Sequence, residues 1–438
     1  MEVNIIGAGL AGCECAYFLA RNGIRVNLYE MKNIKKTPAQ ISNNFAELVC
    51  SNSLKSEEKT NACGLLKLEM AKFKSLFIEA AYMARVPAGQ ALAVDREKFS
   101  SYITEKIKNN KNINMISKVV EDISSIPGIK VIATGPLTDE KLMKSISDFL
   151  GDDSLYFYDA EAPIMDATTI DMNIAYELDR YSSDYSKGDY INLPMNKEEY
   201  MKFYKELVNA KQAPRHEFDK LVLFEGCMPI EEMAKRGEKT LVFGPLKPVG
   251  LDNPRTGEKN YAVVQLRAEN NNKTMYNMVG FQTALTFSEQ KRIFQMIPGL
   301  ENAEFIRYGV MHRNTYINSG KYLNDNFRLR KNDSIYFAGQ ISGVEGYVES
   351  AASGLMVAIC ILNKLKLNID TKFLDTTIMG SLAKYISTEN KNFQPMNANF
   401  GILKPLDEKV KDKKLRYEKQ ANIALDAIDE FIKEYNIK

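Results

Sequence analysis

The chain has 438 residues, which is long enough to bury a large core and to form two or three structural units. Its 58 Lys and Arg residues nearly balance 56 Asp and Glu residues, so the formal net charge of +2 does not indicate a nucleic-acid-binding protein, although a local basic patch stays open. Six cysteines lack metal-ligand spacing, no apolar run reaches the roughly 18 residues of a membrane span, and no signal peptide opens the chain, so we expect a cytoplasmic protein with free thiols, no metal and no membrane.

The first thirty residues match a dinucleotide-binding strand–helix–strand unit. An apolar strand at residues 3–6 is followed by a glycine-rich turn, a helix from Leu10, a strand at 25–29 and an acid at Glu30. The first glycine allows a tight turn, the second lets backbone approach a pyrophosphate, the third lets helix pack on strand, and Glu30 accepts from ribose hydroxyls. The predicted cofactor residues here are Gly7, Ala8, Gly9, Leu10, Ala11, Gly12 and Glu30.

Cys50 lies in a loop of Ser and Asn residues that follows this unit. A buried, inert cysteine and a reactive cysteine beside a cofactor are both compatible with this setting. Further on, we expect a helix beginning near Asn61, a helix capped by Asp95 that runs to Ile107, and strands at 114–120 and 130–136. The second of these strands ends in Ala-Thr-Gly, which is typical of the close of the first half of a flavoprotein cofactor domain.

The middle of the chain reads as a separate, inserted α+β domain, with strands expected at 239–244 and 261–266. Within it, Cys227 follows a strand pattern and precedes a helix that has Pro229 near its first turn. A helix N-terminus favours a thiolate, so Cys227 is a candidate nucleophile, although many such cysteines are inert. Seven basic residues follow and form either a solvated charged face or a track for RNA phosphates: Lys235, Arg236, Lys239, Lys247, Arg255, Lys259 and Arg267.

Residues 333–340 again have the pattern of a cofactor-binding domain. They form a predicted strand that ends at Gly339 and Gln340, and the chain then passes through Gly343 into a predicted helix of small residues at 351–362. The N-terminus of such a helix points at the flavin in glutathione-reductase-type folds. We therefore predict a glutathione-reductase-like, FAD-binding Rossmann domain (α/β), built from residues 1–137 and 310–438, with an inserted α+β domain at 138–309 and a helical C-terminal tail.

Seven motifs in this order resemble the folate- and FAD-dependent RNA uridine-5 methyltransferases, and the resemblance covers essentially the whole chain. Cys63 and Gly320 depart from the family pattern without touching the assigned chemistry. The motifs lie at residues 7–12, 47–56, 86–96, 224–231, 311–316, 339–350 and 393–401.

The resemblance implies a reaction and its participants. The cofactors would be FAD, 5,10-methylenetetrahydrofolate as methylene donor, and NADH or NADPH as reductant. Cys227 would add to uracil C6, while Cys50 would support the flavin-bound carbon or assist removal of the C5 proton. Tyr347 and His312 would flank a pterin stacked on the flavin.

The substrate that the resemblance favours is uridine 54 in the T loop of tRNA, and no obligate protein partner is evident. The same chemistry on a uridine of 23S ribosomal RNA stays an alternative, because the motifs surround the reaction centre and say little about the RNA that docks. A small-molecule flavin oxidoreductase and an RNA-binding flavoprotein without turnover are less favoured alternatives.

Overall fold

The two segments predicted to form the cofactor domain, before and after the middle of the chain, contribute strands to one five-stranded parallel sheet. Its strand order is β16-β7-β1-β2-β6. The computed structural model describes residues 2–37, 39–153, 155–180, 188–213, 228–391 and 393–437. The last strand along the chain pairs with β7, so the sheet requires segments some two hundred residues apart in sequence. Its strands are β1 Glu2–Ile6, β2 Arg25–Glu30, β6 Ile113–Ser117, β7 Lys130–Ile132 and β16 Ile335–Phe337.

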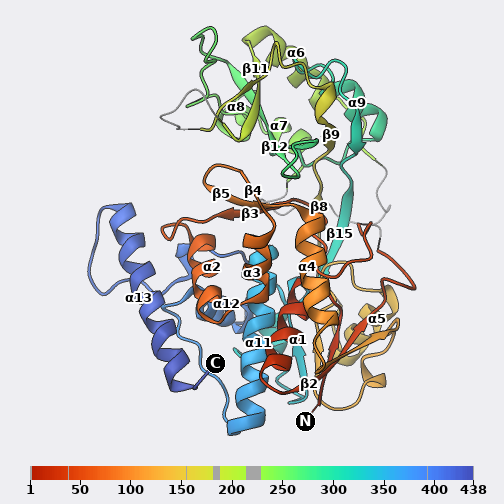
Figure 1. The fold of residues 1–438 in the computed structure, drawn as a ribbon, viewed down its shortest axis with the longest axis vertical. Helices are drawn as coiled ribbons and strands as arrows, with labels where there is room; N and C mark the ends of the chain where they lie inside the picture. Colours follow the sequence, from red (N-terminus) through yellow and green to blue (C-terminus); the bar gives the residue numbers. More distant parts are fainter. Residues whose placement is uncertain are drawn as a thin grey trace.

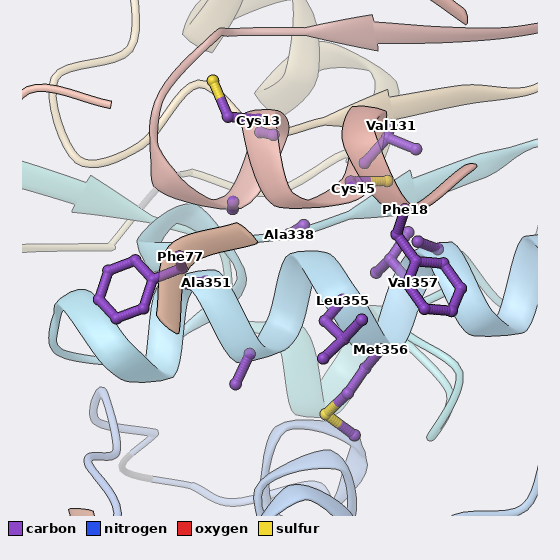
Figure 2. Close-up of a cluster of buried hydrophobic side chains, with 14 of the residues drawn as sticks. Cys13, Cys15, Phe18, Phe77, Val131, Ala338, Ala351, Leu355, Met356 and Val357 are labelled. Atoms are coloured by element: carbon purple, nitrogen blue, oxygen red, sulfur yellow. The ribbon is translucent and has the colours of Figure 1, made fainter. Parts of the chain in front are cut away.

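Two helices that follow strands of this sheet, α1 (Leu10–Arg21) and α11 (Tyr347–Leu367), cross in close contact. A Cβ on Gly354 would lie 2.1 Å from the Ala11 carbonyl oxygen, so the backbones approach closely only because residue 354 is glycine. Figure 2 shows Phe18 of α1 beside Val357 of α11 in the buried cluster. The predicted strand and helix types of the opening unit are confirmed.

The remaining helices of this part pack around the sheet and its first helices, and α13, the last of them, lies on the outside against α2 (Figure 1). Asp95 caps α4 by accepting from the Lys98 N–H at 3.1 Å, as the sequence predicted, and Asn61 caps α2 in the same way through the Cys63 N–H at 3.1 Å. These helices are α2 Ala62–Lys72, α3 Leu76–Met83, α4 Arg96–Lys108, α5 Glu140–Leu150, α10 Ser319–Tyr322, α12 Ile378–Ser387 and α13 Lys413–Glu434.

A second sheet of six strands, with the order β10-β11-β12-β13-β9-β14, forms the upper part of the molecule in Figure 1 and has its own apolar core. All its strand pairs are antiparallel. The strands are β9 Ile164–Asp166, β10 Tyr176–Glu177, β11 Tyr190–Met195, β12 Ala262–Ala268, β13 Met275–Met278 and β14 Phe305–Arg307. The helices beside them are α6 Lys197–Val208, α7 Ile230–Lys235, α8 Thr240–Phe243 and α9 Phe287–Phe294.

One strand prediction in this part is confirmed and one is wrong. The strand expected at 261–266 is β12, whereas residues 239–244 contain the short helix α8. Backbone N–H groups of Gly244 and Leu246 both donate to the Leu241 carbonyl, at 3.1 and 2.9 Å, and close a turn. Leu241 is buried while Phe243 is 78% exposed, so local turn geometry overrides the β-propensity of Leu, Val and Phe.

Smaller sheets connect the two parts. β8 (Leu155–Ala160) pairs antiparallel with β15 (Met311–Tyr316), and these strands run between the two large sheets in Figure 1. A three-stranded sheet lies beside them, with strands β3 Ser53–Ser56, β4 Arg85–Val86 and β5 Ala91–Val94. Among the described residues, only α11 has the length and apolar composition of a membrane span, and 83% of that window is buried inside the protein.

Candidate functional site

A cavity of about 420 Å³ lies at the carboxyl ends of strands β1, β2 and β7. This is where ligands bind in open parallel sheets, and the volume is typical of a small-molecule site. Residues from the beginning, the middle and the end of the sequence meet here. The predicted site residues that line the cavity are Gly7, Gly9, Leu10, Ala11, Glu30, Cys50, His312, Gly339, Gln340 and Tyr347.

The three glycines of the opening turn differ in what surrounds them. Gly7 has a φ of +101°, and a Cβ on Gly12 would lie 1.8 Å from the Gly7 carbonyl oxygen. A Cβ on Gly9, in contrast, would meet no heavy atom within 4 Å, and Gly9 faces the cavity. The turn is therefore built by Gly7 and Gly12, while Gly9 leaves open space where a phosphate group can approach backbone.

Glu30 is held in place at the end of β2. Its carboxylate accepts from the Ala8 N–H at 2.7 Å and from the Lys32 N–H at 2.8 Å, and it faces the cavity. Ala8, Gly12 and Gly343 do not line the cavity. Ala8 fixes Glu30, Gly12 packs against Gly7, and Gly343 has a φ of +86° and lies against the Phe393 ring.

Cys50 and Tyr347 lie next to each other on the cavity wall. The Tyr347 hydroxyl oxygen accepts from the backbone N–H groups of Cys50 at 2.6 Å and Ser51 at 3.0 Å. The Cys50 thiol points toward the Ala160 carbonyl oxygen, at 3.7 Å. Burial, and then the negative charges of Asp159 and Glu161, raise the pKa of the Cys50 thiol well above its ordinary value. The thiol is therefore protonated at neutral pH.

His312 faces the same cavity from β15. Its Nε2 lies 3.0 Å from Oε1 of Glu161, and the other oxygen of Glu161 pairs with Arg307 at 2.6 Å. Glu161 is 2% exposed, so the carboxylate is buried between two cationic or hydrogen-bonding partners and orients the imidazole.

Asp159 and Glu161 are functional candidates that the sequence analysis missed. Both line the cavity, beside Gln282 and Asn314, and the Asn314 side chain donates to Asp159 at 3.4 Å. The available signal was the spacing of two acids at i and i+2 in an apolar segment, which places them on one face of a strand. The same spacing is common on solvent-exposed strand faces.

The first turn of α11 also contributes to the cavity wall, through residues 347–350. The positive end of this 21-residue helix favours negative charge in the cavity. Glu345, just before the helix, accepts from the Gln340 side chain, and burial followed by the charge of Asp159 raises the pKa of Glu345 well above its ordinary value. The raised pKa makes the neutral form of Glu345 easier to populate than that of an exposed carboxylate.

Two predictions about the middle of the chain have different outcomes. Cys227 lies outside the described residues. Arg267, predicted as part of an exposed basic cluster, is 6% exposed and donates to Ser51 and Asn52, so its assignment to a phosphate-binding face is wrong. Arg255 is exposed, but its guanidinium donates to backbone carbonyls of residues 172, 173 and 175.

The cavity fits a flavin dinucleotide. The open strip over Gly9 suits a pyrophosphate, the fixed carboxylate of Glu30 suits ribose hydroxyls, and the N-terminus of α11 suits the electron-rich end of an isoalloxazine ring.

Comparisons with known proteins agree with this arrangement. The model of the family described as "Glucose inhibited division protein A" matches residues 2–368. The structure of Aquifex aeolicus GidA in one crystal form aligns with a TM-score of 0.70 at 15% identity, covering 100% of this chain and 77% of that one, and shows the shared FAD-type Rossmann fold.

Two curated relatives are much closer in sequence. The methylenetetrahydrofolate--tRNA-(uracil-5-)-methyltransferase TrmFO of Staphylococcus carnosus is 54% identical over 432 residues, which covers 98% of both chains. The enzyme of the same name from Staphylococcus haemolyticus is 55% identical over 434 residues, covering 98% of this chain and 99% of its own. At this identity over nearly the full length, the chain belongs to the TrmFO family of methylenetetrahydrofolate-dependent tRNA (uracil-5-)-methyltransferases.

Proposed function

We propose that the protein methylates C5 of uridine 54 in the T loop of tRNA, using methylenetetrahydrofolate as carbon source, FAD as redox cofactor and NADH or NADPH as reductant. The observation that carries the proposal is the meeting of the glycine turn, Cys50, His312 and Tyr347 on one cavity, in a chain whose relatives are named for this reaction. A cytoplasmic location and the division of the chain at residues 137/138 and 309/310 belong to the same proposal, with α5 (Glu140–Leu150), just past the first boundary, packed on the core of the cofactor part.

Cys227 is the proposed nucleophile. Uracil C5 is a weak nucleophile, so a thiolate first bonds to C6 and makes C5 an enolate carbon. Cys227 lies outside the described residues, but the nearby chain supports the assignment. Ile230, three residues on, donates its N–H to the Gln282 carbonyl at 2.7 Å, and Gln282 lines the cavity.

The proposed reaction transfers one carbon from folate to C5 of uracil. C5 bonds to the methylene carbon of the folate, the bond between that carbon and the folate nitrogen breaks so that tetrahydrofolate leaves, and the C5 proton passes to a base. The sulfur–C6 bond breaks as the methylene carbon is reduced, which restores the uracil ring and releases Cys227. When bound, reduced FAD supplies the two electrons that convert methylene to methyl. The target uridine must leave its base stack to reach the cavity.

Residues on the cavity wall position the reactants. His312, oriented by Glu161, offers a flat ring against a pterin, and Tyr347 offers another. The protonated thiol of Cys50 supports the one-carbon group as a hydrogen-bond donor rather than as the base that removes the C5 proton, because its pKa is raised. Glu345 lines the cavity near them, and its raised pKa favours the neutral acid there.

A reconstitution tests the proposal. Purified protein with FAD, NADPH and methylenetetrahydrofolate should place 5-methyluridine in a tRNA transcript and leave a 23S ribosomal RNA fragment unmodified, as read by nucleoside mass spectrometry. Cys227→Ala should abolish both the product and the covalent RNA adduct. A colourless protein that takes up no FAD, or methylation of the ribosomal fragment alone, would contradict the proposal.

A further inference from the structure

The loop that carries Cys50 is held from the second sheet. Arg267, near the end of β12, donates from Nε to Asn52 Oδ1 at 2.8 Å and from Nη2 to Ser51 Oγ at 2.9 Å. Asn52 in turn donates to the Ala268 carbonyl at 2.9 Å. These groups are buried, with Arg267 6% and Asn52 0% exposed, so the bonds are shielded from water.

A second arginine holds the other side of Cys50. Arg96, the first residue of α4, donates from Nη1 to the carbonyls of Leu48 at 3.1 Å and Val49 at 3.3 Å. The Arg96 guanidinium pairs with Glu269, whose carboxylate lies 2.8 Å from Nε. Arg267 lies on β12 and Glu269 is the residue that follows the strand, so the end of β12 holds one flank of Cys50 directly and the other through Arg96.

The structure assigns to Arg267 and to the Arg96–Glu269 pair a positioning role: we propose that strand β12 fixes the Cys50 loop, and with it the contact between Cys50 and Tyr347, for the reaction in the cavity. The inference rests on the proposed function. Because the Cys50 and Ser51 N–H groups both bond to the Tyr347 hydroxyl, a shift of the loop moves the thiol and removes the two donors that fix the Tyr347 ring.

The bonds also explain a buried cation that the cavity itself does not use. Besides Ser51 and Asn52, the Arg267 guanidinium contacts Asn277 Oδ1, at 3.4 Å, and the hydroxyl of Tyr190. Burying a guanidinium without partners is costly, so the loop and the arginine require each other. The part of the molecule proposed to face RNA is thereby linked to the reactive loop.

The test measures Cys50 directly as well as turnover. In Arg267→Met, iodoacetamide should alkylate Cys50 faster at pH 8, by about tenfold for each unit that the thiol pKa falls toward its ordinary value. The kcat for tRNA methylation should fall while the KM for tRNA stays the same. Arg267→Lys, which keeps a donor, should recover part of both. Arg25→Met, which replaces an exposed arginine at the start of β2, serves as the control and should match the wild type.

A second variant keeps the test informative if Arg267→Met does not fold. Glu269→Gln keeps side-chain shape but weakens the pairing with Arg96, and should change Cys50 alkylation in the same direction. Unchanged alkylation and kcat in both folded variants would overturn the positioning role. Failure of the proposed function is a different result: the wild type would then not methylate tRNA, while the alkylation difference between wild type and Arg267→Met would persist.

Discussion

At the scale of single residues, Gly9 and Gly12 have different roles: Gly9 is expected to matter for FAD binding and Gly12 for folding. Gly12→Ala drives a Cβ to 1.8 Å from the Gly7 oxygen and should destabilise the protein by about 1–3 kcal/mol, as overpacking does. Gly9→Ala meets no atom and should leave the free energy of unfolding within about 0.5 kcal/mol of wild type. Urea unfolding and FAD titration check both. Gly9→Ala should bind FAD more weakly, and an FAD affinity equal to wild type would refute the phosphate-approach role.

Asp159 allows a residue-scale test of the charge around Cys50. Its negative charge is, after burial, the largest cause of the raised pKa of the Cys50 thiol. Asp159→Asn should therefore lower that pKa and shift the pH profile of Cys50 alkylation toward lower pH, measured by peptide mass mapping. Asp152→Asn, at a surface pair with Lys321, is the matched control and should leave the profile unchanged. An unshifted profile in Asp159→Asn would show that the charge of Asp159 does not contribute to the raised pKa of the Cys50 thiol.

At the scale of elements, the N-terminus of α12 gives a pH dependence. The buried carboxyl of Glu69 accepts from the N–H groups of Ile378 at 2.8 Å and Met379 at 2.9 Å, and burial, only partly opposed by these bonds, raises its pKa to about 8. The folded state then holds a proton that the unfolded state has lost above its lower pKa, near 4.5. Stability should fall between about pH 5 and pH 8, by up to about 1.4 kcal/mol per pH unit for this group.

Glu69→Gln tests that slope, because an amide cannot ionise. The variant should lose one of the two accepted bonds and be less stable at pH 5, yet lose less stability than wild type between pH 5 and pH 8. Thermal or urea unfolding across this range measures both. Glu408→Gln, at an exposed pair with Lys419, is the control. Parallel pH dependences for Glu69→Gln and wild type would exclude Glu69 as their source.

At the scale of the whole molecule, the candidates for RNA contact are the exposed lysines of the part that contains the six-stranded sheet. Replacing Lys239 and Lys259 together by Gln should weaken tRNA binding and reduce the slope of log K against log salt by about one per lysine. The control replaces Lys413 and Lys433 of α13, a helix far from the second sheet in Figure 1. Equal salt slopes for both double variants, measured by filter binding, would place the RNA elsewhere.

The sequence predicted the elements whose signal is local. The glycine turn, the Asp95 cap and the strand at β12 follow from residues within a few positions of each other. It did not predict the helix at α8, because alternation of Leu and Phe in four residues does not distinguish a strand from one turn closed at Gly244. The sequence also did not predict contacts between distant segments, such as the hydrogen bond from Arg267 to Asn52, 215 positions away. A charged residue in a sequence does not show whether its side chain is buried, as that of Arg267 is.

The position of β16, which is translated after the other strands of the five-stranded sheet, affects how the protein folds during synthesis. Chain order places residues 335–337 on the exposed edge of β7, and α11 then crosses α1 at Gly354. A nascent chain that has emerged only to residue 330 has an unpaired sheet edge and lacks Gly339, Gln340 and Tyr347 from its cavity wall. Assembly of the cofactor cavity therefore waits until Tyr347, about four fifths of the way along the 438 residues, has left the ribosome, and the second sheet has its whole sequence available to fold before then.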